Sequence, residues 1–133
     1  MSGRFFDTNI LIHALSPTAK GEVARHVLGR GGAISVQVLN EFVNVSHRKY
    51  GKNWREIGNA KSQLCRSLIV HPLSEEAHEY GCAMAQRYRL SVYDAMIAGS
   101  AFVLGCDVLF TEEMQDGLVL DGRLTVENPF RDL

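Results

Sequence analysis

Residues 4–11 read RFFDTNIL, and the interpretation of the whole chain starts from this stretch. The apolar segment 4–6 predicts a short buried strand, and residues 8–15 predict a helix that follows almost at once. Asp7 stands at the junction between the two. A buried, ionised carboxylate costs several kcal/mol unless a positive group compensates its charge. The stretch therefore predicts the first unit of an alternating strand–helix fold, with an acid at the edge of its sheet.

Two further carboxylates stand in apolar surroundings. Glu41 lies inside the apolar run 36–45, and Asp94 opens an apolar helix that continues as Ala95-Met96-Ile97-Ala98. Three such acids on separate elements suggest one shared compensating group, and a divalent cation is the simplest candidate. The sequence therefore favours a metal-dependent enzyme.

Each acid also has a purely structural interpretation. Asp7 fits a helix cap, as do Thr8 and Asn9 beside it. Asp94 fits the capping box Ser91-x-x-Asp94, in which its side chain returns to a backbone N–H. Glu41 would need to extend to solvent or form a salt bridge. The functional interpretation fails only if the structural interpretation is correct for each of the three acids.

Strand and helix patterns alternate along the chain, which indicates parallel strands joined by right-handed crossovers. We expect one domain over residues 1–133, an α/β fold built as a three-layer α/β/α sandwich. Its central, mostly parallel sheet has four to five strands. The predicted strands are 4–6, 33–35, 69–71, 107–110 and 124–126. The predicted helices are 8–15, 20–29, 37–50, one after Asn53, one after Ser74, and 91–104. Ligands in such folds bind outside the carboxyl ends of the strands, where Asp7 and Thr111 fall.

A fourth acid is expected from the loop that follows the strand 107–110. This loop reads Thr111-Glu112-Glu113-Met114-Gln115-Asp116-Gly117. Asp116 before a glycine also fits a turn residue, and Thr111 a cap. Chemistry alone does not choose among Glu112, Glu113 and Asp116.

Composition narrows the class of protein. The chain has 133 residues, 46% hydrophobic and 22% charged, with net charge −1, so no global positive field indicates a nucleic-acid partner. If bound metal neutralises four carboxylates, the rest of the chain carries a small positive net charge. Three cysteines without C-x-x-C spacing, no signal peptide and no membrane-spanning apolar run predict a cytoplasmic protein with reduced cysteines. The five histidines lack zinc-site spacing, and clustered carboxylates favour Mg²⁺ or Mn²⁺.

Four motifs in order carry a family resemblance: Phe6-Asp7-Thr8-Asn9-Ile10-Leu11, Asn40-Glu41-Phe42, Tyr93-Asp94-Ala95-Met96-Ile97-Ala98 and Leu109-Phe110-Thr111 with a trailing acid. Together they resemble the PIN-domain ribonucleases, and more narrowly the VapC toxins of bacterial toxin–antitoxin pairs. The resemblance assigns metal binding and catalysis to Asp7, Glu41, Asp94 and, for the fourth acid, Asp116, with Glu113 as its main rival. Asp116 departs from the family in being followed by Gly117 instead of Phe. Thr8, Asn9 and Thr111 match positions that orient the acids or a coordinated water molecule.

The resemblance also implies an activity and partners. The activity is endoribonuclease cleavage of RNA with Mg²⁺ or Mn²⁺, leaving a 5′-phosphate and a 3′-hydroxyl. The partners are a second copy in a homodimer and a cognate antitoxin that inserts a segment near the acidic pocket. We expect that segment to dock on an apolar groove around helices 20–29 and 37–50, which places Val27 at the contact.

RNA also requires cations for its phosphates. The densest basic stretch, residues 47–55, contains two aromatic residues that can stack on unpaired bases, Tyr50 and Trp54. The expected RNA-binding residues are Arg48, Lys49, Lys52 and Arg55 in this stretch and Arg87 and Arg89 before the Asp94 helix. A solvated helix end is the structural alternative for both groups.

Two other functions remain compatible with the residues. One is an acid-lined module that binds metal or RNA without cleaving it. The other, which we rank lower, is a metal-dependent phosphatase with Asp7 as nucleophile, because the chain lacks an obvious second acid in D-x-D spacing and a basic phosphate clamp.

Overall fold

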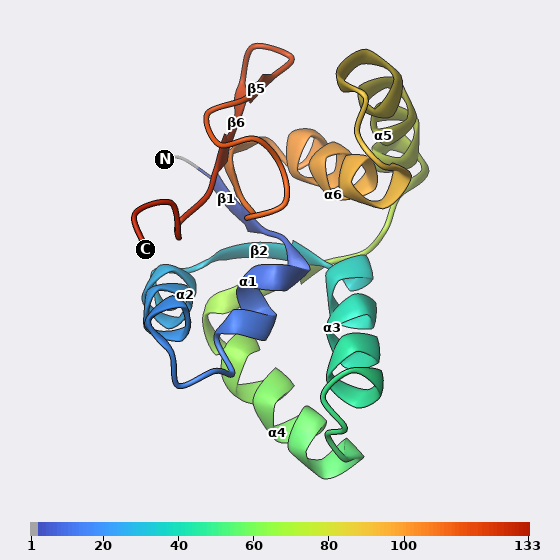
Figure 1. The fold of residues 1–133 in the computed structure, drawn as a ribbon. Helices are drawn as coiled ribbons and strands as arrows, with labels where there is room; N and C mark the ends of the chain where they lie inside the picture. The colour runs from blue at the N-terminus through green and yellow to red at the C-terminus, as the bar shows by residue number, and fades with distance from the viewer. Residues whose placement is uncertain (1–2) are drawn as a thin grey trace.

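A six-stranded sheet forms the centre of the protein (Figure 1). The computed structural model describes residues 3–133. The strands lie in the order β3-β2-β1-β4-β6-β5, and all neighbours are parallel except β5 and β6. Their bounds are β1 Gly3–Phe6, β2 Gly32–Ser35, β3 Leu68–His71, β4 Cys106–Phe110, β5 Val119–Leu120 and β6 Leu124–Glu127.

Helices cover both faces of the sheet, as Figure 1 shows. On one face lie α1 (Thr8–His13), α2 (Ala19–Gly29), α3 (Val36–Arg48) and α4 (Trp54–Leu64), which is followed by the short 3₁₀ helix η1 (Cys65–Ser67). On the other face lie α5 (Glu75–Tyr88) and α6 (Val92–Val103). The predicted three-layer α/β/α sandwich is confirmed, and most element ends agree with the sequence within two residues.

The sheet has one strand more than the expected four to five. The additional strand, β5, has only two residues and pairs antiparallel with β6. Asp121 and Gly122 between them both have positive φ (47° and 70°), and Arg123 N donates to Leu120 O at 3.1 Å. An Asp-Gly pair is a strong signal for a tight hairpin turn. That signal was available in the sequence, but a strand of two residues leaves no pattern of alternation.

The order of the strands places a functional edge between β1 and β4. From β1 the chain moves through β2 to β3 on one side, and it returns through α5 and α6 to β4 on the other side. The direction of winding therefore reverses at the β1–β4 pair, which is where α/β sheets bind their ligands. Asp7 and Thr111 follow these two strands directly.

The core beneath this edge is apolar and closely packed. Phe5, Phe6 and Leu109 are fully buried, and the rings of Phe6 and Phe110 stack with centroids 5.3 Å apart. Any charge at the ends of β1 and β4 therefore borders a medium that solvates it poorly.

Helix α6 is held close to α5 by two glycines. A Cβ atom at Gly99 would lie 2.5 Å from Ala77 O, and one at Gly81 would lie 2.6 Å from the Met96 sulfur. Only glycine allows the two backbones to approach this far. The contact fixes the position of α6, whose first turn carries Asp94. Over residues 3–133 no helix combines the length and the apolar character needed to cross a membrane.

Candidate metal centre

Asp7 is both a helix cap and a buried acid. Its carboxylate accepts hydrogen bonds from Thr8 N (2.6 Å), the Thr111 hydroxyl (2.8 Å) and the Asn9 amide (3.2 Å), and the residue is 3% exposed. Burial raises the pKa of Asp7 to about 7; the bonds from Thr111 and Thr8 oppose the rise, and the charges of Glu113 and Asp94 add to it. The predicted cap is therefore present, and the same carboxylate still lies among other acids.

Asp94 has its carboxylate available. Ser91 caps α6 by accepting from Asp94 N at 3.3 Å, but the Asp94 side chain returns no hydrogen bond to Ser91 or to any other described residue. One oxygen each of Asp7, Asp94 and Glu113 lie within 4.8 Å of one another. We call these three residues the acid cluster. Hard oxygen donors at this spacing fit Mg²⁺ or Mn²⁺.

The loop after β4 separates its three acids by role. Glu113 joins the acid cluster, and its backbone N–H donates to the Thr111 hydroxyl at 3.1 Å. Partial burial, then Asp94, then Glu112 raise the pKa of Glu113. Asp116 lies outside the cluster: its Oδ1 accepts from Asn128 N at 2.7 Å, and it does not line the acidic pocket.

Glu112 faces the same pocket but is already paired. His13 Nε2 lies 2.5 Å from Glu112 Oε1, and Lys20 Nζ donates to Oε2 at 2.9 Å. Partial burial acts to raise the pKa of Glu112, but the bonds and charges of His13 and Lys20 together lower it. Sequence reasoning missed this pairing, because its partners stand more than ninety residues away from the loop.

Glu41 lines the acidic pocket from α3. The pocket has a volume of about 300 Å³ and includes Asp7, Asp94 and Glu113 in its lining. Glu41 is half-buried, and the Gln37 amide one turn earlier donates to its Oε1 at 3.2 Å. Burial raises the pKa of Glu41, and the nearby charges of Asp94 and Glu113 add to the rise. Glu41 is not one of the three acids within 4.8 Å, so it borders the acid cluster without joining it.

The predicted polar residues surround Asp7. Asn9 bridges the Asp7 carboxylate and the Thr111 hydroxyl, each at 3.2 Å, and its Oδ1 accepts from Glu112 N at the same distance. The Thr8 hydroxyl is buried and faces Glu41, where it acts to lower the pKa of that carboxyl against the rise caused by burial.

The predicted RNA-binding residues fall into two groups. Lys49 and Tyr50 line the acidic pocket itself and Lys52 lines the adjoining hollow, while Arg48 and Arg55 are exposed and line neither. Arg87 instead forms an ion pair with Asp121, and Arg89 ends α5 in a left-handed conformation (φ 55°). Of the predicted RNA-binding cations, Lys49 is therefore the one that lines the pocket of the acids.

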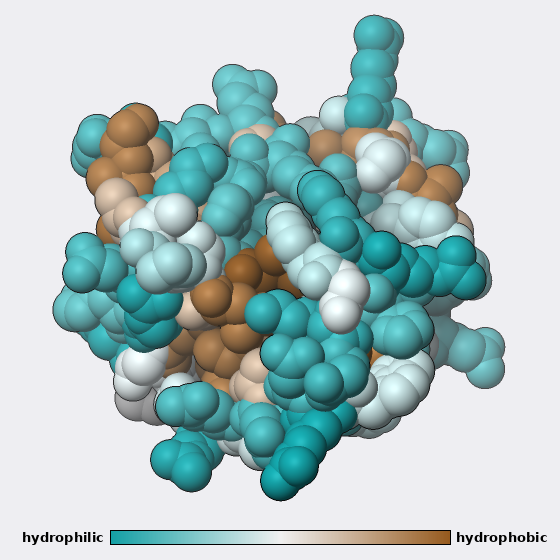
Figure 2. Space-filling model, turned by 60° about the horizontal axis from the view of Figure 1, so that its bottom comes forward, coloured by the Kyte–Doolittle hydropathy of each residue, from teal (hydrophilic) through white to brown (hydrophobic). Residues whose placement is uncertain are grey.

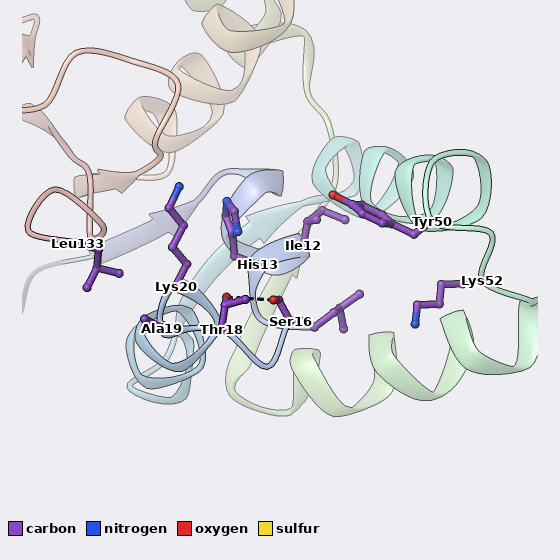
Figure 3. Close-up of a pocket in the computed structure, with 10 residues that line it drawn as sticks. Ile12, His13, Ser16, Thr18, Ala19, Lys20, Tyr50, Lys52 and Leu133 are labelled. Carbon is purple, nitrogen blue, oxygen red and sulfur yellow. Dashed lines mark hydrogen bonds between the residues drawn. The ribbon is translucent and has the colours of Figure 1, made fainter.

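An apolar hollow adjoins the acidic pocket (Figures 2 and 3). It has a volume of about 600 Å³ and opens between the α1–α2 connection and the end of α3. Figure 3 shows Tyr50 and Lys52 on one side and Thr18, Ala19 and Lys20 on the other. Its lining consists of Ile12, His13, Leu15, Ser16, Thr18, Ala19, Lys20, Tyr50, Lys52 and Leu133. Val27, at which the sequence placed the antitoxin contact, is not part of this lining.

Comparison with known proteins gives one family match and several similar solved structures. The profile of the PIN domain family matches residues 4–115. Comparison with curated protein sequences gives no match. A chain of a toxin–antitoxin complex from Klebsiella pneumoniae superposes with a TM-score of 0.73 at 27% identity, covering 96% of this chain and 98% of the other.

Two more distant structures share the fold. One is the Mycobacterium tuberculosis VapC20, a sarcin–ricin loop cleaving toxin (TM-score 0.67, 18% identity, covering 84% of this chain and 92% of the other). The other is the DNA-bound VapBC from Salmonella typhimurium (TM-score 0.69, 19% identity, covering 95% and 98%).

Proposed function

This chain belongs to the PIN-domain family, and we propose that it is a metal-dependent endoribonuclease, the toxin of a toxin–antitoxin pair. One observation carries the proposal: Asp7, Asp94 and Glu113 come from three separate elements and meet within 4.8 Å at the edge where β1 and β4 end. The chain's similarity to PIN toxins, one of them named for cleaving the sarcin–ricin loop, supports RNA as the substrate.

We assign the metal to the acid cluster. Asp7, Asp94 and Glu113 would hold Mg²⁺ or Mn²⁺, with Glu41 beside them, and Glu113 takes the place that the family resemblance gave to Asp116. A bound cation would supply Lewis-acid activation of a water molecule and stabilisation of the charge on the scissile phosphate.

The chain's own residues would orient the acids and accept a proton. Thr111 and Asn9 hold Asp7 Oδ2 in place, and Gln37 holds Glu41 Oε1. The raised pKa of Glu41 suits it to accept the proton of the attacking water. The water oxygen bonds to phosphorus, the P–O3′ bond breaks, and the 3′ oxygen takes up a proton from solvent. The products are a 5′-phosphate and a 3′-hydroxyl.

Cleavage of RNA by the purified protein tests the enzyme. We expect structured RNAs to be cut with Mg²⁺ or Mn²⁺, and cutting to stop with a chelator or with Asp7→Ala. RNA that stays intact with both metals would favour the non-catalytic, acid-lined module. Cutting by Asp7→Ala at the wild-type rate would point to a contaminating nuclease.

We propose that an antitoxin segment occupies the apolar hollow. The hollow lies beside the acidic pocket, so one segment can place apolar side chains in the hollow and a cation on the carboxylates. The matched variants are Ala19→Glu, which puts a charge into the hollow, and Ala83→Glu, on the exposed face of α5. Ala19→Glu should weaken antitoxin binding at least about tenfold, because the added carboxylate loses its hydration when an apolar segment covers it. Equal binding by the two variants would exclude this surface.

We also propose a homodimer that covers the edge strand β3. Ile69 on this strand is 65% exposed, and Val70 and Leu73 beside it are exposed as well. Exposed apolar residues on an edge strand favour association. Sedimentation of Ile69→Lys should give a monomer. Val119→Lys on the opposite edge strand, β5, should leave the dimer unchanged.

A further inference from the structure

We infer that His78 and Cys82 on α5 form a binding site for a transition-metal ion of the zinc class, separate from the acid cluster. We call these two residues the thiol–imidazole pair. Neither of them lines the acidic pocket or the apolar hollow, and α5 lies on the opposite face of the sheet from α1 to α4 (Figure 1). The inference goes beyond the proposed function and does not depend on it.

The two ligand atoms already lie at the distance of a chelate. Cys82 Sγ lies 3.6 Å from His78 Nε2. A tetrahedral zinc ion, with Zn–S of about 2.3 Å and Zn–N of about 2.0–2.1 Å, holds its sulfur and nitrogen ligands about 3.6 Å apart. An ion can therefore replace the hydrogen shared by these two atoms with little movement of either side chain.

Helix α5 holds the thiol–imidazole pair in place. His78 and Cys82 are four positions apart, so their side chains are neighbours on one face of the helix. Ser74 caps the helix by accepting from Ala77 N at 3.1 Å, and Gly81 is buried against α6. A site on a fixed backbone loses less conformational entropy on binding than a flexible one.

The surroundings of the pair suit a cation. Residues 75–86 contain three glutamates and no lysine or arginine. Glu75 stands three positions before His78 and Glu79 three positions before Cys82, so both carboxylates border the pair. Both are exposed, and neither forms an ion pair or a side-chain hydrogen bond within residues 3–133. They supply negative charge, and with water they complete the coordination of an ion held by sulfur and nitrogen.

The thiol–imidazole pair and the acid cluster favour different metals. A thiolate and an imidazole select zinc or copper, whereas a set of carboxylates selects magnesium or manganese. The histidines lack the spacing of a four-ligand zinc site, and for that reason the sequence favoured only Mg²⁺ or Mn²⁺. The i, i+4 spacing of His78 and Cys82 is the signal that could have found a chelate on one helix.

Cobalt(II) is a direct probe of this site. The full, reduced chain is titrated with Co²⁺ in an excess of Mg²⁺, which occupies the acid cluster. Charge-transfer absorption from thiolate to cobalt in the near ultraviolet reports only an ion that is bound to sulfur. We expect this absorption in the wild type and its loss when Zn²⁺ is added, because zinc binds such ligands more tightly than cobalt. Its absence from the wild type would overturn the inference and leave the pair as a hydrogen bond only.

Matched variants identify the ligands. Cys82→Ser should abolish the absorption, and His78→Ala should weaken Co²⁺ binding by about tenfold or more. Cys65→Ser, which removes the other half-buried cysteine, should keep both the absorption and the affinity. Circular dichroism checks that each variant is folded. Absorption that persists in Cys82→Ser would contradict the proposal.

The neighbouring charge gives a smaller effect. Glu79→Gln should weaken Co²⁺ binding by about twofold, because it removes one negative charge within a helical turn of the ion. Glu22→Gln, on the exposed side of α2, should not change it. Equal affinities for Glu79→Gln and Glu22→Gln would remove the glutamates from the site as we describe it.

Thermal unfolding separates this site from the acid cluster. Zinc should still raise the Tm of Asp94→Asn, in which the acid cluster lacks one ligand, because a ligand that binds the folded state stabilises it. Adding Cys82→Ser to that variant should remove most of the rise. A rise of the same size in the double variant would place the zinc elsewhere and overturn the inference.

Discussion

Two helices of this protein begin with the same sequence pattern and use it differently. Helix α4 begins at Asn53-x-x-Glu56 and α6 at Ser91-x-x-Asp94. In α4 the box is complete: Asn53 Oδ1 accepts from Glu56 N at 2.8 Å, and Glu56 accepts from Asn53 N at 3.1 Å. In α6 only the Ser91 half forms. The Glu56 carboxylate is used to cap its own helix. The Asp94 carboxylate makes no such bond and is available to bind a ligand.

The surroundings of the two acids explain the difference. Glu56 is exposed, so its charge is solvated at little cost. Asp94 lies against Asp7 and Glu113, and its negative charge contributes to the raised pKa of Asp7, Glu41 and Glu113. The carboxylates of Asp7, Asp94 and Glu113 therefore repel one another at the start of α6, and capping of this helix does not require that repulsion. Acids whose pKa values are shifted by their neighbours are typical of a functional site.

Substitution of Asp94 and of Glu56 should give the largest difference in the rate of RNA cleavage. We expect Asp94→Asn to lower the rate of RNA cleavage at least about a hundredfold, because losing a ligand removes several kcal/mol of metal-derived stabilisation. Glu56→Gln should leave the rate within about twofold. Initial rates under saturating Mn²⁺ check the pair, and equal loss in both variants would mean that Asp94 has only a structural role.

The loop after β4 allows a second contrast within five residues. Glu113→Gln removes a member of the acid cluster and should slow cleavage about ten- to a hundredfold. Asp116→Asn keeps an oxygen that can accept from Asn128 N, so we expect wild-type rates. If Asp116→Asn slows cleavage and Glu113→Gln does not, Asp116 would be the fourth acid of the site.

Stability should depend on pH because Asp7 is buried. Its pKa in the folded chain is about 7, above the ordinary 3.8, so the folded state binds more protons than the unfolded state between these values. The contribution of Asp7 is fully present at low pH and is lost as pH rises toward 7. Metal-free protein should lose roughly 2–3 kcal/mol of unfolding free energy between pH 5 and pH 8.

Urea unfolding at the two pH values measures this loss. Added Mg²⁺ or Mn²⁺ should restore much of the stability at pH 8, because a ligand that binds only the folded state stabilises it. Asp94→Asn should lose less stability with pH and gain less from metal. A flat profile in the metal-free wild type would count against a repulsive acid cluster.

The smallest expected effect concerns the caps themselves. Asn53→Ala and Ser91→Ala should each cost about 1 kcal/mol of unfolding free energy. Only Ser91→Ala should also weaken metal binding, because it loosens the turn that carries Asp94. Calorimetric titration with Mn²⁺ checks this, and equal metal affinities would show that Asp94 does not depend on its cap.

The sequence predicted the elements whose signals are local. Asp7 after an apolar strand, the capped starts of α4 and α5, and the apolar α6 were all predicted from neighbouring residues. Alternation of strands and helices then predicted the layers, and with them the edge where Asp7 and Thr111 meet.

The remaining features depend on contacts between distant residues. Our proposal of Glu113 in place of Asp116 rests on a loop that turns Asp116 toward Asn128 of the C-terminal segment, which no spacing indicates. The His13–Glu112 pair joins residues ninety-nine positions apart, so it too left no pattern. Gln37 was missed although its i, i+4 spacing to Glu41 is a helix signal that could have found it.

The central claim is that the oxygens of Asp7, Asp94 and Glu113 hold one divalent cation. Anomalous diffraction from crystals soaked in Mn²⁺ tests it most directly. We predict one strong peak bordered by all three carboxylates, and its absence from crystals of Asp94→Asn. A map with no peak between them, and with the three side chains directed apart, would contradict the account.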